Sequence, residues 1–170
     1  LAGCRSHAQA PATVTLDPNV KHQTIRGWSC NPWYRGIAPK LRDQLLDEAI
    51  NELGLTRVRW QQANGNRSAE RSWEAQNDDG DPDTINWAGF LTADADRAIE
   101  TWVVPFKQRV EANGEPFELW MSPSFFDGGS TGTVPAWLLH SPGEYAEYTV
   151  AYLKHMKEKH GVEATHYVIC

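Results

Sequence analysis

The sequence predicts an α/β protein in which parallel strands alternate with helices. Segments of strand-like composition and segments of helical periodicity follow one another in the order strand, helix, strand, helix, strand, helix, strand. Each helical segment ends at a glycine, which is typical of a helix C-terminus. The connections after strands are longer and richer in Trp, Asn and Gly than those after helices. Such a chain forms parallel strands joined by right-handed crossovers, with its functional residues in the loops that follow the strands.

Residues 1–11 indicate an exported protein. Leu-Ala-Gly followed by Cys4 resembles the small-residue box before the lipid-modified cysteine of bacterial lipoproteins, and a polar tether comes next. Ala8-Gln9-Ala10 offers an alternative cleavage pattern, although Pro11 directly after it would hinder cleavage. We therefore expect a secreted or cell-envelope bacterial lipoprotein, with lipidation of Cys4 as the favoured route. That lipid is the only membrane attachment we expect, because no run approaches the ~18 apolar residues of a membrane helix.

The next part of the chain predicts strands on both sides of a helix. Residues 12–17 alternate like a strand, and a turn at Asp17-Pro18-Asn19 completes an N-terminal unit over 12–22. A second strand covers 23–30, and a third, 55–60, directly follows the helix. The helix presents these apolar residues at helical spacing: Leu41, Leu45, Leu46, Ala49, Ile50 and Leu53.

A polar segment over 61–91 is too long for a plain connection, so we expect it to be functional or to carry small elements of its own. A second helix covers about 92–113, and Pro105 inside it should kink or split it. Strand 116–121 follows. The apolar face of this helix consists of Ile99, Trp102, Val103, Phe106 and Val110.

The third helix has the clearest start. Ser141 is suited to the N-cap, Pro142 to the first helical position and Glu144 to the third, which is a capping box. The helix continues to Gly161, and the run over 164–170 predicts a last buried strand.

Composition and charge exclude several classes of function. The net charge of −6, the pI near 5.5 and the lack of a basic stripe argue against a nucleic-acid partner. Eight tryptophans suit flat apolar ligands such as sugar rings. The three cysteines are far apart in sequence and form neither a disulfide framework nor a metal cluster.

We expect no metal and no cofactor. The acidic run over 77–83 resembles a calcium-binding loop, but it lacks the spacing of ligands and the terminal Glu of an EF-hand. We therefore interpret it as a solvated turn. His155 and His160 are five residues apart, so we expect them not to share a helix face. Cys30 and Cys170 would lie on strands too far apart for a disulfide.

Three motifs in order carry a resemblance to a known family. They are Gln-Thr-Ile-Arg-Gly-Trp at 23–28, Leu-Gly-Leu-Thr-Arg-Val-Arg-Trp at 53–60 and Met-Ser-Pro at 121–123, and the rhythm of 145–162 adds to them. The chain resembles retaining glycoside hydrolases of clan A, most of all family 30, which includes glucosylceramidases, β-1,4-xylanases and endo-β-1,6-galactanases. The resemblance spans roughly residues 13–170.

The resemblance implies that residues 23–170 are the first half of a (β/α)8 TIM barrel, strands one to four, because a whole barrel needs ~250 residues. The strand over 12–22 would belong beside the barrel, in a side β-domain. Family members hydrolyse β-glycosidic bonds with two glutamates. The acid/base Glu would come just after Cys170 and the nucleophile after the seventh strand. We therefore expect no catalytic residue in this chain, a carbohydrate substrate for the parent enzyme and an inactive fragment.

The substrate-binding residues that we expect fall into two groups. Arg57 matches the family's strand-two arginine, which helps hold the nucleophile and the sugar, and we expect Arg57 rather than Arg59 to face the barrel interior. The second group consists of aromatic and amide side chains at or beyond strand ends: Trp33, Trp60, Trp137, Phe125, Asn31 and Asn64.

Two other interpretations stay open. The parent could be a non-catalytic carbohydrate-binding protein of the same fold that lacks one or both glutamates. Alternatively, the chain could be a complete α/β domain with four parallel strands. That third interpretation predicts a stable monomer, whereas a half barrel predicts exposed strand edges and self-association.

Overall fold

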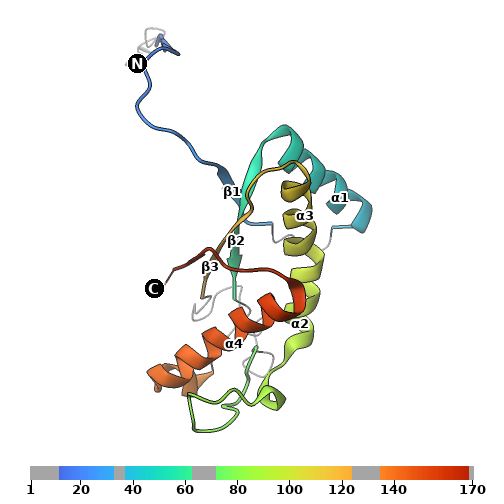
Figure 1. Ribbon diagram of the computed structural model, residues 1–170, viewed down its shortest axis with the longest axis vertical. Coiled ribbons are helices and arrows are strands. Elements are labelled where there is room, and N and C mark those ends of the chain that lie inside the picture. Colours follow the sequence, from blue (N-terminus) through green and yellow to red (C-terminus); the bar gives the residue numbers. More distant parts are fainter. Residues whose placement is uncertain (1–11, 33–36, 63–71, 124–134, 169–170) are drawn as a thin grey trace, which may run out of the picture.

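The computed structural model describes residues 12–32, 37–62, 72–123 and 135–168. Its centre is a four-stranded sheet in the order β1-β2-β3-β4, and every neighbouring pair is parallel (Figure 1). The strands are β1 (Trp28–Cys30), β2 (Leu55–Gln61), β3 (Glu118–Ser122) and β4 (His166–Tyr167). The prediction of an α/β protein with parallel strands is confirmed.

Helices connect each strand to the next. Between β1 and β2, α1 (Pro39–Asp47) continues into a π-helical turn, η1 (Glu48–Glu52). Between β2 and β3 lie a 3-10 turn, η3 (Trp87–Gly89), and then α2 (Thr92–Ala98), η4 (Ile99–Val103) and α3 (Val104–Ala112). Between β3 and β4 lie η5 (Ala136–Leu139) and α4 (Pro142–His160).

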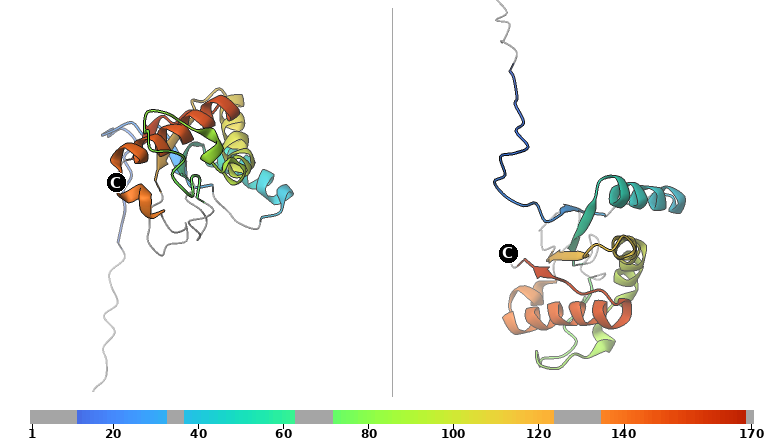
Figure 2. Two further views of the ribbon diagram at one scale, coloured as in Figure 1. Left: turned by 90° about the horizontal axis from the view of Figure 1, so that it is seen from below. Right: turned by 45° about the horizontal axis from the view of Figure 1, so that its top comes forward.

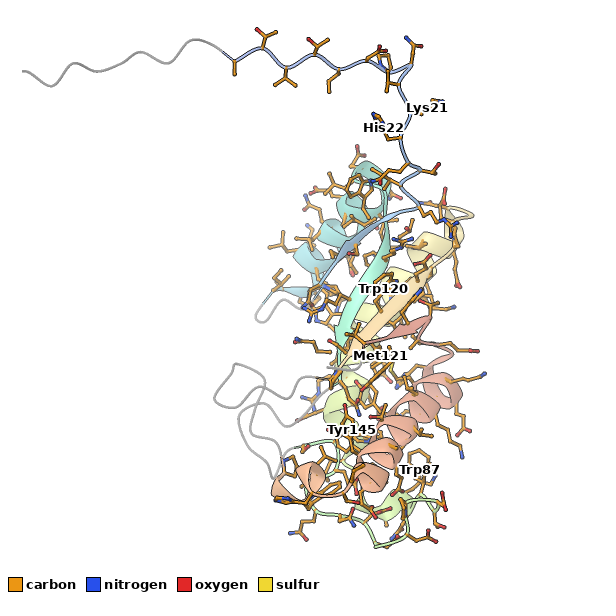
Figure 3. The ribbon with its side chains drawn as sticks, turned by 90° about the vertical axis from the view of Figure 1, so that its left-hand side faces the viewer. Lys21, His22, Trp87, Trp120, Met121 and Tyr145 are labelled. Carbon is orange, nitrogen blue, oxygen red and sulfur yellow. The ribbon has the colours of Figure 1, made fainter. Side chains whose placement is uncertain are left out.

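The helices cover one face of the sheet. On β2 and β3, the alternate residues Val58, Trp60, Leu119 and Met121 are buried. On the opposite face, Arg59 and His166 are exposed, as is Trp120, which Figure 3 labels. Figure 2 shows α3 and α4 packed along the sheet. The core therefore lies between the sheet and the helices, and no described helix or strand covers the other face, which we call the open face.

The second and third helices supply most of this core. All five residues of the expected apolar face over 92–113 are buried: Ile99, Trp102, Val103, Phe106 and Val110. On α4, Tyr148, Tyr152 and Met156 are buried as well. The first helix contributes less than its pattern predicts, because only Leu46 and Ile50 are buried while Leu41, Leu45 and Leu53 are exposed.

Pro105 changes the hydrogen bonding of its helix. It lies in the first turn of α3, directly after the π-helical turn η4. Proline has no N–H to donate, and its ring crowds the carbonyl one turn earlier, so a wider turn at this point accommodates it. The expected split is therefore present as a change of helix type within one helical column (Figure 1).

The N-terminal strand predicted over 12–17 is wrong. These residues are extended and exposed, and they pair with no strand in the described part of the chain. An alternating pattern forms a strand only where a partner supplies the ladder. The predicted turn is confirmed, because the N–H of Asn19 donates to Asp17 Oδ1 at 2.9 Å. Among the described residues, no helix has the length and apolar character needed to span a membrane.

Candidate functional site

The carboxyl ends of β2 and β3 meet α4 in a buried polar network centred on Gln62. Gln62 follows β2 and is 1% exposed. Its backbone N–H donates to the Ser122 carbonyl at 3.0 Å, and its Nε2 donates to the Tyr148 carbonyl at 3.2 Å. Its Oε1 accepts a hydrogen bond from the Tyr167 hydroxyl at 2.9 Å. Gln62 thus joins three strands' ends to α4 and fixes this rim of the sheet.

Tyrosine hydroxyls extend the network. Tyr148 Oη lies 3.4 Å from Ser72 Oγ, and Trp60 Nε1 donates to Tyr152 Oη at 3.3 Å. Burial raises the pKa of Tyr148 well above its usual range, so this phenol stays neutral and can both donate and accept hydrogen bonds. The rim is therefore held by neutral polar groups.

Two buried polar atoms near this rim have no hydrogen-bond partner among the described residues: Ser122 Oγ and Trp137 Nε1. The Trp137 ring contacts Tyr148 edge to face, with ring centroids 6.5 Å apart. Buried donors without partners are rare in folded proteins, and they are often completed by water or by a ligand. Each of these two atoms can hydrogen-bond a hydroxyl group.

The structure separates the aromatic and amide residues that the sequence placed together. Trp60 lies on the helix-covered face, 1% exposed, so it belongs to the core and cannot present a ring face to a sugar. Trp137 is half-buried in η5, and Asn31 is exposed directly after β1. Trp33, Asn64 and Phe125 lie outside the described residues.

Arg57 lies on the open face of the sheet and forms an ion pair with Glu118. Its Nη2 donates to Glu118 Oε1 at 3.3 Å; its Nε is 2.7 Å from Oε2 but is not aligned for a hydrogen bond. The guanidinium also lies 5.8 Å from the Trp120 ring centroid, and Trp120 stacks on His166 at 4.4 Å. The Trp120 N–H, followed by the Arg57 guanidinium, lowers the pKa of Glu118.

The expectation that only Arg57 of the two arginines faces this side is wrong. Residues two apart on a strand point to the same face, so Arg59 shares the open face with Arg57. Arg57 is also paired in register with Glu118, the first residue of β3. At about 3.3 Å per residue, its Cα lies roughly 13 Å below the carboxyl end of β2. Arg57 therefore does not contact the network around Gln62.

Sequence reasoning missed the polar residues that build the rim. Gln62, Ser122 and Tyr167 follow or end their strands, and this position was the available signal. Tyr148 falls within the predicted third helix, but that prediction included no role for its hydroxyl. The rim of the parallel sheet was predicted as the functional edge, but not the residues that form it.

The described residues include two groups that could hold a metal ion. Asp96, His155 and His160 form the first, and Asp78, Glu144 and Glu147 form the second. In the first group, both histidine Nε2 atoms lie within 2.7 Å of Asp96 Oδ1. His155 and His160 were expected not to share a helix face. That expectation is wrong, because both side chains reach the same oxygen of Asp96.

Cys30 shows no sign of reactivity. It is half-buried at the end of β1, and burial raises the pKa of its thiol, which therefore stays protonated near neutral pH. Cys4 and Cys170 lie outside the described residues, so lipidation of the one and the distance between the other and Cys30 remain predictions.

Comparison of the chain with protein-family models, with curated proteins and with solved structures gave no significant match.

Proposed function

We propose that this chain forms strands one to four of a (β/α)8 barrel, with the three helical connections between them, in an exported retaining glycoside hydrolase. The observation that carries the proposal is the sheet order, in which four consecutive strands are parallel neighbours and their helices cover one face. In an open doubly wound sheet, the strand order reverses and helices cover both faces. Consecutive order with one covered face is the arrangement of a barrel wall.

The open face of the sheet supports the same proposal. In a closed barrel this face is the interior, and here it carries Arg57, Glu118, Trp120 and His166 in mutual contact. A charged and aromatic layer suits a barrel that places a carboxylate nucleophile above it. The positive charge of Arg57 is already paired with Glu118, and it lies below the rim at which a nucleophile would stand. In this proposal Arg57 stabilises the barrel interior and does not bind sugar at the rim.

The sugar would bind at the carboxyl rim, as ligands do in barrels of this type. Asn31, Ser122 and Trp137 are the described residues suited to contact it. The two catalytic carboxyl groups, about 5 Å apart in a retaining enzyme, are assigned to residues beyond Cys170. The close carboxyl groups of Glu144 and Glu147 are not candidates, because both side chains are buried and belong to α4 rather than to a strand end.

Sequencing the source DNA past the codon for Cys170 tests the catalytic half of the proposal. We expect Asn-Glu-Pro next and a second Glu after a seventh strand. A barrel without both glutamates would leave a carbohydrate-binding protein, and an immediate stop codon would refute the hydrolase.

A binding measurement tests the rim on the chain itself. Titration with β-linked xylo- and galacto-oligosaccharides should quench tryptophan fluorescence. Trp137→Ala should remove this change, while Trp87→Ala should retain it, because Trp87 is exposed in η3 and contacts Phe90 and His155 rather than the rim. Equal quenching in both variants would exclude Trp137 from the site.

A further inference from the structure

Four acidic side chains gather where the loop over 77–83 meets the beginning of α4. Carboxylate oxygens of Asp78, Glu144 and Glu147 lie within 4.8 Å of one another. Glu74 completes the group, since its Oε1 accepts a hydrogen bond from the backbone N–H of Asp78 at 3.0 Å. Figure 3 shows the first part of α4, where Tyr145 is labelled, at the same end of the molecule as Trp87. We call these four residues the acidic cluster.

Three members of the acidic cluster are buried, and each has one carboxylate oxygen without a hydrogen-bond partner. Glu74, Glu144 and Glu147 are 1%, 6% and 4% exposed. One oxygen of each, Glu74 Oε2, Glu144 Oε2 and Glu147 Oε1, has no hydrogen-bond partner among the described residues. None of the ion pairs between described residues involves the cluster. Burying an ionised carboxylate without a partner destabilises the folded state, so each of these oxygens requires a proton or a cation to offset that cost.

The backbone holds Asp78 in place for the other members. Its Oδ1 accepts from the N–H of Asp79 at 2.7 Å and its Oδ2 from the N–H of Asn86 at 2.6 Å. The loop also packs tightly on α4, because a Cβ added at Gly143 would lie 3.1 Å from the Pro82 ring. The carboxylate of Asp78 is thus oriented towards the helix before any ligand binds.

The Asp96 group shows how this fold otherwise satisfies a buried carboxylate. Asp96 Oδ2 is 2.6 Å from Lys159 Nζ, and Oδ1 is 2.6 and 2.7 Å from the Nε2 atoms of His155 and His160. Every oxygen of Asp96 therefore has a nitrogen partner. The acidic cluster contains more carboxylates, and no such partner is found for it among the described residues.

We propose that Asp78, Glu144 and Glu147, with Glu74 beside them, bind a calcium ion that ties the 77–83 loop to the beginning of α4. Oxygen-only ligands select hard cations, and a site with several carboxylates suits Ca²⁺, because Mg²⁺ uses one or two carboxylates and keeps its waters. The loop supplies one ligand and the helix supplies two, on adjacent turns of one face. This inference does not depend on the glycosidase proposal.

The electrostatics of the free cluster agree with this assignment. Burial, followed by the charges of Asp78 and Glu144, raises the pKa of Glu147 to about 7. Burial is also the main cause that raises the pKa of Glu74 to about 8, against the opposing hydrogen bond from Asp78. Burial and mutual repulsion thus disfavour the ionised forms of these carboxyl groups, and a divalent cation would remove the repulsion between them.

The test uses the whole chain stripped with EDTA at pH 7.5. Added CaCl₂ should raise its melting temperature, and Tb³⁺ should give luminescence sensitised by nearby tryptophans, which calcium then displaces. Glu147→Gln should weaken calcium binding by roughly tenfold or more, because ligand charge sets affinity in such sites. Asp83→Asn is the matched control, since it removes one charge from the same loop outside the cluster and should keep both responses.

Glu147→Gln has a second expected property that a misfolded variant would lack. In EDTA its melting temperature should equal or exceed that of the wild type, because it removes one of the repelling charges. Glu144→Gln provides an independent variant with the same expectation. The proposal is overturned if the wild type shows neither a calcium-dependent rise nor displaceable Tb³⁺ luminescence, or if both Gln variants respond to calcium as the wild type does.

Discussion

At the scale of single residues, Asp96 is the best-supported buried charge in the described structure. The residue is 7% exposed, and its carboxylate is held by Lys159, His155 and His160. Replacing it with Asn removes the charge that these three donors share. We expect Asp96→Asn to lower the free energy of unfolding by about 2 kcal/mol, since hydrogen bonds to charged groups contribute about 1.5–3 kcal/mol. Urea denaturation measures the change.

Glu111→Gln is the control for this measurement. Glu111 forms a partly exposed ion pair with Lys107 one turn away on α3, and such pairs contribute about 0.3–0.5 kcal/mol. If the two variants lose the same small amount, the Asp96 group does not stabilise the fold.

The pH dependence of the same residue follows from its pKa. Burial alone would raise the pKa of Asp96, but the hydrogen bonds from Lys159, His155 and His160 outweigh it and hold the pKa far below the ordinary value. A carboxyl group with a lowered folded pKa stabilises the protein above its unfolded pKa, about 3.9, and loses that contribution as the pH falls further. The stability gap between wild type and Asp96→Asn should therefore be constant from pH 6 to about 4 and narrow below it. Urea midpoints measured from pH 6 to 3 give this gap, and a gap that widened on acidification would contradict the assignment.

The residue scale also separates what the strand period could have predicted about the site from what it could not. Trp60 was expected at the rim because it ends a strand, but the alternation that buries Val58 buries Trp60 as well. The same alternation places Arg57 and Arg59 together, so correct use of the strand period would have settled both positions. The acidic cluster could not be predicted from the sequence, because its members become neighbours only when the loop folds onto α4.

At the scale of elements, periodicity predicted the buried helices well and the peripheral ones poorly. The faces over 92–113 and 142–160 are buried because the sheet lies against them. The apolar pattern over 40–53 is just as regular, yet Leu41, Leu45 and Leu53 are exposed. The strand predicted over 12–17 fails for the same reason, since a pattern states what a segment can cover but not whether a partner is present.

Helix termination gives an element-scale prediction that the sequence and the structure share. Gly161 ends α4 with φ 63°, in the left-handed region, and a Cβ added there would meet no atom within 4 Å. Gly161→Ala should therefore lower the free energy of unfolding by about 1 kcal/mol through backbone strain alone. Gly80→Ala is the matched control, because its Cβ would also meet nothing but its φ lies outside that region. Thermal unfolding of both variants compares them, and equal losses would mean that the left-handed conformation is not the cause.

At the scale of the whole molecule, the main feature is a sheet that the described helices cover on one face only. The open face carries Trp120 and His166, and β1 at one edge carries the exposed Trp28. Leu41 in α1 and Leu53 directly after η1 are exposed as well. Unpaired strand edges and exposed apolar groups are the usual sites of self-association. In the proposed barrel, further strands and helices would cover these surfaces.

We therefore expect the 170-residue chain to dimerise or aggregate on its own. Light scattering coupled to size exclusion measures its mass as a function of concentration. Trp28→Lys places a charge on the β1 edge, where it should disfavour edge-to-edge pairing and shift the population towards monomer. Val150→Lys is the control, because Val150 is a comparably exposed apolar residue on α4, away from the edge, and its replacement should leave the association unchanged. A monomeric wild type with a sharp cooperative melt would instead favour a complete four-stranded domain, since such a domain would not need the covering that a barrel supplies.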